Sequence, residues 1–167
     1  MAYSLFEKIQ TDLGKWLTGA RSLIVLGIGN ELRGDDAAGL LTARMLKRFN
    51  SDRFEAVECG VSIESCIDYA FEKKPSHLLI IDAFTHRGLV LLDPEDLESR
   101  IPVSTHTIPL PLLMDALGKP PETSVKILGV GVENFEFGAS ISRECLKTVE
   151  EISKVIIDVA SRTGILK

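Results

Sequence analysis

Hydrophobic side chains along the chain alternate between helical spacing and short continuous runs. Five segments repeat apolar residues every three to four positions, which predicts amphipathic helices. The predicted helices span residues 3–18, 35–49, 62–71, 109–117 and 139–161. Short apolar or weakly alternating runs between turn residues predict strands. The predicted strands span residues 22–27, 54–59, 77–82, 89–92 and 125–130.

One helix followed by strands that alternate with helices predicts an α/β layer fold with a mainly parallel sheet. The 167 residues fit one domain, residues 1–167, by the usual length of domains. A domain of this size buries roughly 70% of the surface of its unfolded chain. Its core therefore needs neither a disulfide nor a structural metal.

Composition and charge limit the kinds of partner and the cell compartment that can be expected. The net charge of −5 argues against a nucleic-acid backbone as the main partner. No window approaches the ~18 consecutive apolar residues of a membrane span, and the N-terminal stretch has no apolar signal region. Cys59, Cys66 and Cys145 lack metal-finger spacing, and their odd number favours a reducing compartment. We therefore expect a cytoplasmic protein.

Ligands of such sheets bind outside the carboxyl ends of the strands, so the residues that follow each strand are the candidates for chemistry. Asp35 and Asp36 open the predicted helix after the first strand. Either carboxylate could simply cap that helix, and one could cap while the other faces the crevice. Asp82 ends a buried run, where a carboxylate is costly unless it is hydrogen-bonded or paired with a cation. His106 precedes a helix; a loop histidine is a possible ligand but is often only solvated.

The same strand ends allow two other kinds of site. Gly27 and Gly29 resemble the start of a dinucleotide fingerprint, but Leu32 stands where its third glycine would be. Two adjacent carboxylates at a helix start would also repel a pyrophosphate. Cys59 follows a strand, so a cysteine nucleophile with a distant histidine stays conceivable.

Asp36, Asp82 and His106 could instead meet at one crevice. Mixed oxygen and nitrogen ligands suit a borderline divalent ion such as zinc or nickel. Three protein ligands leave coordination positions for water or substrate. Sequence spacing alone does not establish that the three meet.

Four segments in the same order resemble the [NiFe] hydrogenase maturation endopeptidases. The first joins G-x-G-N to an acidic pair, the second ends in Ile-Asp-Ala, the third contains His106 and the fourth is the late strand. They are residues 27–39, 79–83, 104–110 and 125–131. Within the family, the branch that processes formate-hydrogenlyase-type hydrogenase 3 is the most similar. The sequence departs from the family at Glu58-Cys59-Gly60, where D-G-G or D-G-T is usual, and in the added N-terminal helix, residues 3–18.

This resemblance implies a three-layer fold, with helices on both faces of a twisted sheet. It implies a protease that recognises nickel in the precursor large subunit of a [NiFe] hydrogenase and removes the C-terminal extension. Asp36, Asp82 and His106 would be the metal ligands. Nickel would arrive on the cysteines of the substrate, so the isolated enzyme need not contain metal. A non-catalytic nickel or large-subunit chaperone and a nucleotide-binding α/β module remain the alternatives.

Overall fold

The computed structural model describes residues 4–85, 87–97 and 109–167. Five strands form one sheet in the order β2-β1-β3-β5-β4. The strands are β1 (Leu23–Ile28), β2 (Phe54–Gly60), β3 (His77–Phe84), β4 (Leu89–Leu92) and β5 (Ser124–Gly131). The first four in the spatial order run parallel, and β4 pairs with β5 antiparallel. The expected mainly parallel sheet is confirmed.

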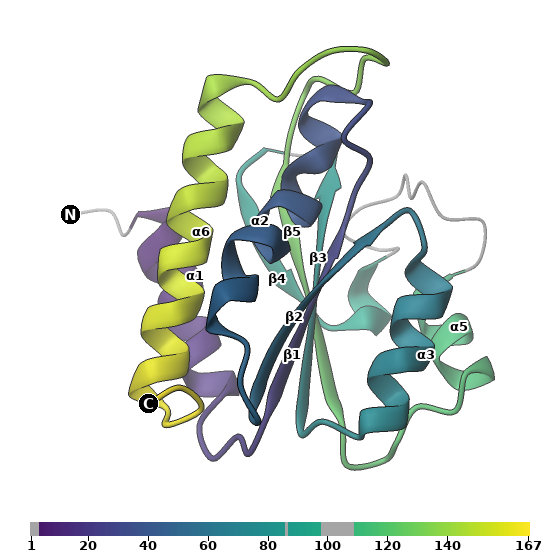
Figure 1. Cartoon of the computed structure of the whole chain (residues 1–167), viewed down its shortest axis with the longest axis vertical. Coiled ribbons are helices and arrows are strands. Elements are labelled where there is room, and N and C mark those ends of the chain that lie inside the picture. Colours follow the sequence, from purple (N-terminus) through teal and green to yellow (C-terminus); the bar gives the residue numbers. More distant parts are fainter. Residues whose placement is uncertain (1–3, 86, 98–108) are drawn as a thin grey trace.

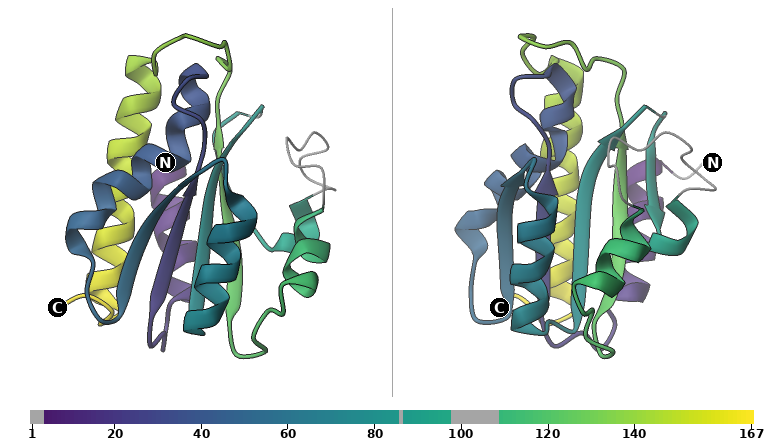
Figure 2. Two further views of the ribbon diagram at one scale, coloured as in Figure 1. Left: turned by 45° about the vertical axis from the view of Figure 1, so that its right-hand side comes forward. Right: turned by 90° about the vertical axis from the view of Figure 1, so that its right-hand side faces the viewer.

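Helices cover both faces of this sheet (Figures 1 and 2). One face carries α1 (Leu5–Trp16), α2 (Ala38–Leu46) and α6 (Arg143–Arg162). The other carries α3 (Ile63–Lys73) and α5 (Leu110–Ala116), with the short 3-10 turn η3 (Pro94–Asp96) nearby. The three-layer arrangement is therefore confirmed. No helix in the described part of the chain is long and apolar enough to cross a membrane.

The two cores follow from the alternation of side chains along each buried strand. In β1, Val25 faces the core under α2 and α6, whereas Ile24 and Leu26 face α3. In β3, Leu79 and Ile81 join the first core and Ile80 joins the second. Strands buried on both faces need a continuous apolar run, which is the pattern that predicted them.

The predicted helix 35–49 is divided in the structure. It begins as the 3-10 turn η1 (Gly34–Ala37), continues as α2 and ends as a second 3-10 turn, η2 (Lys47–Phe49). Glycine explains why the helix lies so close to the sheet. A Cβ at Gly39 would overlap the carbonyl oxygens of Ile28 and Ile81. α2 can therefore lie directly against the ends of β1 and β3 only because residue 39 is a glycine.

The N-terminal helix α1 is an integral part of the first core. Ile9 and Leu13 are buried there together with residues of α6. Ser4 caps the helix in a capping box with Glu7. At the far end, the Trp16 indole nitrogen donates to the Ser124 hydroxyl at 2.8 Å.

The outer edge of β2 is occupied by a side chain. The backbone nitrogen of Ala56 donates to Asn50 Oδ1 at 2.8 Å, and Asn50 Nδ2 donates to the Ala56 carbonyl at 3.4 Å. Asn50 lies directly after η2, in the loop that returns to the sheet. Its amide therefore makes the pair of hydrogen bonds that a neighbouring strand would otherwise make with Ala56.

Candidate active site

The candidate site lies at the carboxyl edge of the sheet, where the strand order changes direction. From β1 the chain crosses to β2 on one side, and it then returns to place β3 on the other side of β1. The gap between the ends of β1 and β3 is thus the switch point at which α/β sheets bind ligands. In Figure 1 this edge is at the upper end of the strands, near the start of α2.

Asp36 lies on η1, directly beyond the end of β1. Its carboxylate accepts a hydrogen bond from the backbone nitrogen of Asn30 at 3.2 Å, and the residue is half-buried. The backbone is equally constrained, because a Cβ at Gly29 would overlap the carbonyl oxygen of Asp36. The Gly-x-Gly-Asn segment therefore holds the aspartate against the end of β1.

Asp82 is part of β3 itself and has a relative exposure of 4%. Its Oδ1 accepts a hydrogen bond from the backbone nitrogen of Ala83 at 2.8 Å. The carbonyl of the preceding residue, Ile81, is the group against which Gly39 packs. Asp36 lies three residues before Gly39, so η1 and the end of β3 are neighbours across the switch point.

The third predicted ligand, His106, lies outside the described residues, as does His86. Convergence of Asp36, Asp82 and His106 therefore stays a prediction. Within residues 4–85, 87–97 and 109–167, no group of three His, Cys, Asp or Glu side chains is placed to hold a metal. His77 is at the opposite end of β3, where its ring bonds the Trp16 carbonyl, so it belongs to no site at the carboxyl edge.

Asp35 has a role that the sequence did not reveal. Either aspartate could have capped the helix that it opens; both lie in the first turn of η1, but η1 has no side-chain cap. The Asp35 carboxylate instead accepts hydrogen bonds from the backbone nitrogen and the hydroxyl of Ser142, at 2.7 and 2.9 Å. Ser142 is the N-cap of α6. Only the capping role was predicted wrongly, because the partner of Asp35 is 107 residues away in the chain, where no local spacing can indicate it.

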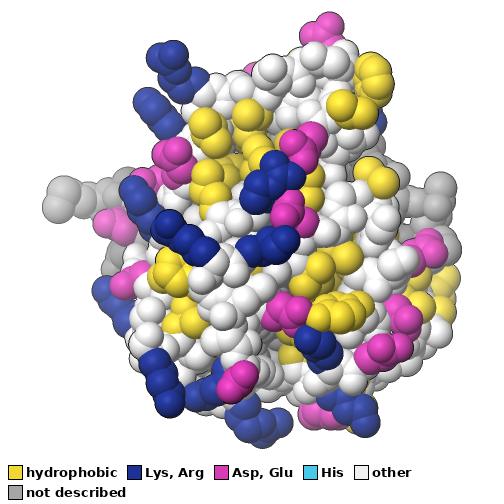
Figure 3. Space-filling view, viewed as in Figure 1, with side chains coloured by type: hydrophobic (Ala, Val, Ile, Leu, Met, Phe, Trp, Pro, Cys, Tyr) yellow, Lys and Arg dark blue, Asp and Glu magenta, His cyan; other side chains and the backbone are white. Residues whose placement is uncertain are grey.

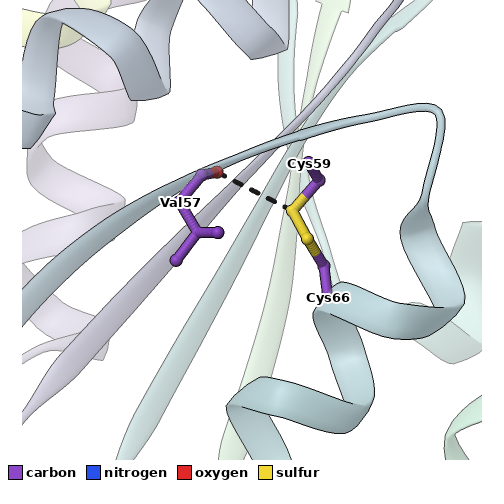
Figure 4. The surroundings of a disulfide bond; sticks show 3 residues. All are labelled: Val57, Cys59 and Cys66. Carbon is purple, nitrogen blue, oxygen red and sulfur yellow. Dashed lines mark hydrogen bonds between the residues drawn. A yellow bond between two sulfur atoms is a disulfide. The ribbon is translucent and has the colours of Figure 1, made fainter.

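Cys59 and Cys66 form a disulfide that joins the end of β2 to α3 (Figure 4). The odd number of cysteines favoured a reducing compartment, and this disulfide removes the support that the cysteines gave to that expectation. The spacing of seven residues gave no signal because it arises from a strand, a turn and the first helical turn. A disulfide sulfur is not a thiolate, so in this state Cys59 is no nucleophile. Cys145 is buried, and burial is the main cause that raises the pKa of its thiol to about 12.

Glu58 lies near the carboxyl end of β2, and its carboxylate is bonded to two cations. It accepts hydrogen bonds from Arg44 at 2.7 Å and from Lys47 at 3.1 Å. Burial alone would raise the pKa of this carboxyl, but the bonds from the two cations outweigh it and lower the pKa. Arg44 also bonds Glu31 in the loop after β1. Glu58 thus ties β2 to α2 and does not line the switch point.

The glycines that resemble a nucleotide fingerprint have packing roles in the structure. Gly27 and Gly39 pack against each other's segments, and Gly29 makes room for the backbone of Asp36. Asp36 lies in the turn where a phosphate would need a cationic or amide-lined site. The protein is therefore a three-layer α/β protein with two carboxylates, Asp36 and Asp82, at the switch point of its sheet. This class is distinct from the dinucleotide-binding domains.

Comparison with known proteins identifies the family. No family model matches the chain. A Methanocaldococcus jannaschii protein, provisionally named a hydrogenase maturation protease, is 30% identical over 162 residues, which cover 90% of this chain and 95% of that protein. Hydrogenase 3 maturation protease of Escherichia coli is 33% identical over 99 residues, which cover 56% of this chain and 63% of that protein.

Solved structures of hydrogenase maturation proteases share the fold of this chain. The [NiFe] hydrogenase maturation protease HycI of Thermococcus kodakarensis superposes with a TM-score of 0.80 at 24% identity, over 90% of this chain and 99% of that one. The Escherichia coli hydrogenase 3 maturation protease gives 0.68 at 26% identity, over 80% and 87%. The chain belongs to the hydrogenase maturation protease family, and it is accordingly a hydrolase of peptide bonds. The family predicted from the four sequence segments is confirmed.

Proposed function

We propose that this protein recognises nickel in the precursor large subunit of a [NiFe] hydrogenase and cleaves off the C-terminal extension of that subunit. The Escherichia coli hydrogenase 3 maturation protease is 33% identical to this chain over the part that matches, so a hydrogenase 3 type of precursor is the first candidate. No helix in the described part of the chain could span a membrane. We propose the cytoplasm as its place of action.

The observation that carries the proposal is the placement of Asp36 and Asp82 on the two sides of the switch point. Each carboxylate is oriented by a backbone N–H, from Asn30 and Ala83 respectively. Oriented oxygen donors with one imidazole from His106 suit a borderline ion such as nickel. The donor set lacks thiolate, so a metal carried on cysteines of the substrate would complete it.

Peptide hydrolysis adds one water across the scissile bond. The water oxygen joins the carbonyl carbon, the C–N bond breaks, and the released amine takes a proton. Nickel carried in by the substrate would supply an orienting template and Lewis acidity at the scissile carbonyl. Asp36, Asp82 and His106 would hold the substrate's ion, so an unloaded precursor would lack the anchor that places its peptide bond at the edge.

The test is to incubate the protein with its precursor, with and without nickel, and to determine the mass of the product. We expect one cut that occurs only in nickel-loaded precursor. Asp36→Asn should abolish the cut with little loss of stability, whereas the adjacent Asp35→Asn should retain it. Equal loss of activity in both variants would contradict the assignment of Asp36 as the ligand.

Nickel affinity separates this mechanism from that of an ordinary metalloprotease. Calorimetry on the free enzyme should show weak binding, because two carboxylates and an imidazole lack a soft ligand for nickel. A purified enzyme with stoichiometric, tightly held zinc that cleaves nickel-free precursor would contradict the proposal. Tight binding of loaded precursor without any cut would favour the non-catalytic chaperone.

A further inference from the structure

Four charged side chains form one bonded network around α2, and Arg44 lies at its centre. Arg44 Nε donates to Glu58 Oε1 at 2.7 Å, and Lys47 Nζ donates to the other oxygen of Glu58 at 3.1 Å. On its other side, the Arg44 guanidinium bonds both oxygens of Glu31, with Nη1 donating to Oε2 at 3.3 Å and Nη2 donating to Oε1. In the region of α2, Figure 3 shows Lys and Arg side chains next to Asp and Glu side chains. Arg44 therefore connects α2 both to the end of β2 and to the loop after β1.

The contact between Arg44 and Glu31 fixes an orientation as well as a distance. Both side chains are about half exposed, and a single exposed ion pair adds little to stability. Here, however, a planar guanidinium meets a carboxylate through two hydrogen bonds, and the same cation also bonds Glu58. The hydrogen bond from Arg44 is the main cause that lowers the pKa of the Glu31 carboxyl below its ordinary value, so Glu31 is charged at neutral pH. The loop after β1 is thereby held to α2 at Glu31.

Glu31 lies within the turn that orients the candidate ligand Asp36. The backbone nitrogen of Asn30 donates to Asp36 Oδ2 at 3.2 Å. The turn is closed by two further bonds, from Leu32 N to Asn30 Oδ1 at 2.9 Å and from Arg33 N to the Asn30 carbonyl at 3.1 Å. A displacement of Glu31 would therefore move the Asn30 N–H as well. Its bond to Asp36 is at the long end of the usual range, so a small displacement is enough to break it.

We infer that Arg44 is a positioning residue for Asp36. By holding Glu31, it keeps the N–H of Asn30 in place, and this N–H orients the carboxylate for the metal ion of the substrate. The inference rests on the proposed function, which makes Asp36 a ligand of that ion. Loss of a residue that orients a metal ligand typically changes metal affinity or activity by about 10–100-fold.

The experiment compares Arg44→Ala and Glu31→Ala with Lys47→Ala as the matched control. Lys47 bonds the same network through Glu58 but makes no printed-range contact with the Asn30 turn, so its loss should leave cleavage unchanged. Arg44→Ala and Glu31→Ala should each raise KM for nickel-loaded precursor about 10-fold and change kcat less than two-fold. Arg44→Lys keeps the charge but cannot form the paired bonds of a guanidinium, so it should restore KM only in part.

The division between KM and kcat separates positioning from a merely structural role. A variant that is only less stable contains less folded enzyme, which lowers the apparent kcat and leaves KM as it was. Unchanged KM in both Arg44→Ala and Glu31→Ala would overturn the inference. An equal rise of KM in Lys47→Ala would overturn it as well, because the effect would then belong to the charge of the surface and not to the Asn30 turn.

Hydrogen exchange of the free enzyme gives a second measurement that needs neither nickel nor precursor. The backbone amide of Asn30 should exchange about 10-fold faster in Arg44→Ala and Glu31→Ala than in wild type, whereas the amides of β3 should exchange at the same rate in all variants. If wild type does not cleave loaded precursor, the proposed function fails, and faster exchange at Asn30 still supports the positioning of Asp36 by Arg44. Unchanged exchange at Asn30 would overturn the inference, whether or not KM rises.

Discussion

The carboxylate of Asp35 binds both the backbone nitrogen and the hydroxyl of Ser142, the residue that caps α6. The Ser142 hydroxyl in turn accepts a hydrogen bond from the backbone nitrogen of Cys145 at 3.1 Å. The turn after β1 is thereby fastened to the start of the last helix. The same turn continues directly into Asp36, so Asp35 stabilises the segment that presents the candidate ligand.

Asp35→Ala should lower the free energy of unfolding by about 2–3 kcal/mol, because a buried, charge-assisted pair of hydrogen bonds is lost and the Ser142 nitrogen is left unpaired. Asp35→Asn should cost about 1 kcal/mol, since the amide retains one acceptor. Urea unfolding of both variants measures the difference. Equal stabilities of the alanine variant and wild type would show that α6 does not need this contact.

Gly39→Ala should be among the most destabilising single changes in the protein. Its Cβ would overlap two backbone carbonyls, which cannot move without shifting β1 or β3, so we expect a loss of about 3 kcal/mol or more. Gly14→Ala is the matched control. Apart from the backbone of its own helix, no atom lies within 4 Å of a Cβ at Gly14, which is inside α1, so alanine there should stabilise the protein by about 1 kcal/mol. Thermal unfolding of the two variants should shift in opposite directions.

The disulfide should stabilise the protein without taking part in cleavage. Closing the short loop between Cys59 and Cys66, which are seven residues apart, removes unfolded-state entropy worth roughly 2–3 kcal/mol. A Cys59→Ser/Cys66→Ser double variant should lose that amount in urea unfolding and keep its cleavage of precursor.

Reductant provides the control for this prediction. It should destabilise wild type to the level of the double variant and leave the double variant unchanged. Abolished cleavage in a folded Cys59→Ser single variant would restore the cysteine-nucleophile hypothesis.

Stability should fall on mild acidification because of His77. Burial, the main cause, lowers the pKa of its ring below the ordinary value in the folded state, with a smaller opposing effect from the Trp16 carbonyl. Between the lowered folded pKa and the unfolded value of about 6.5, the unfolded chain binds more protons, so stability rises with pH across that interval. Urea midpoints from pH 5 to 8 should show this rise. His77→Gln should have a flatter profile, and an identical slope in the variant would exclude His77 as the cause.

The sequence predicted the sheet and its helices because buried strands and amphipathic helices each leave a periodic pattern. The strand Leu89–Leu92 was predicted at its observed bounds. The last helix was predicted to begin at residue 139, but it begins at Arg143 because Ser142 caps it. The irregular residues just before it bond the turn after β1, and such bonds between distant loops have no local signature.

The candidate site was predictable only in part. Asp36 and Asp82 were identified because ligands of α/β sheets bind at strand ends, and the structure places both at the switch point. The roles of Asp35 and Glu58 were not predictable from spacing, since their partners Ser142 and Arg44 come from other elements. The pairing of Cys59 with Cys66 depended on the turn between β2 and α3, which the sequence did not define.

The Asn50 side chain at the outer edge of β2 has a consequence for the behaviour of the protein at high concentration. An edge strand with free N–H and C=O groups can recruit a strand from another molecule and so start aggregation. Asn50 already bonds both backbone groups of Ala56, in the middle of β2. The Asn50 side chain therefore hinders a strand of another molecule from pairing with β2 at Ala56.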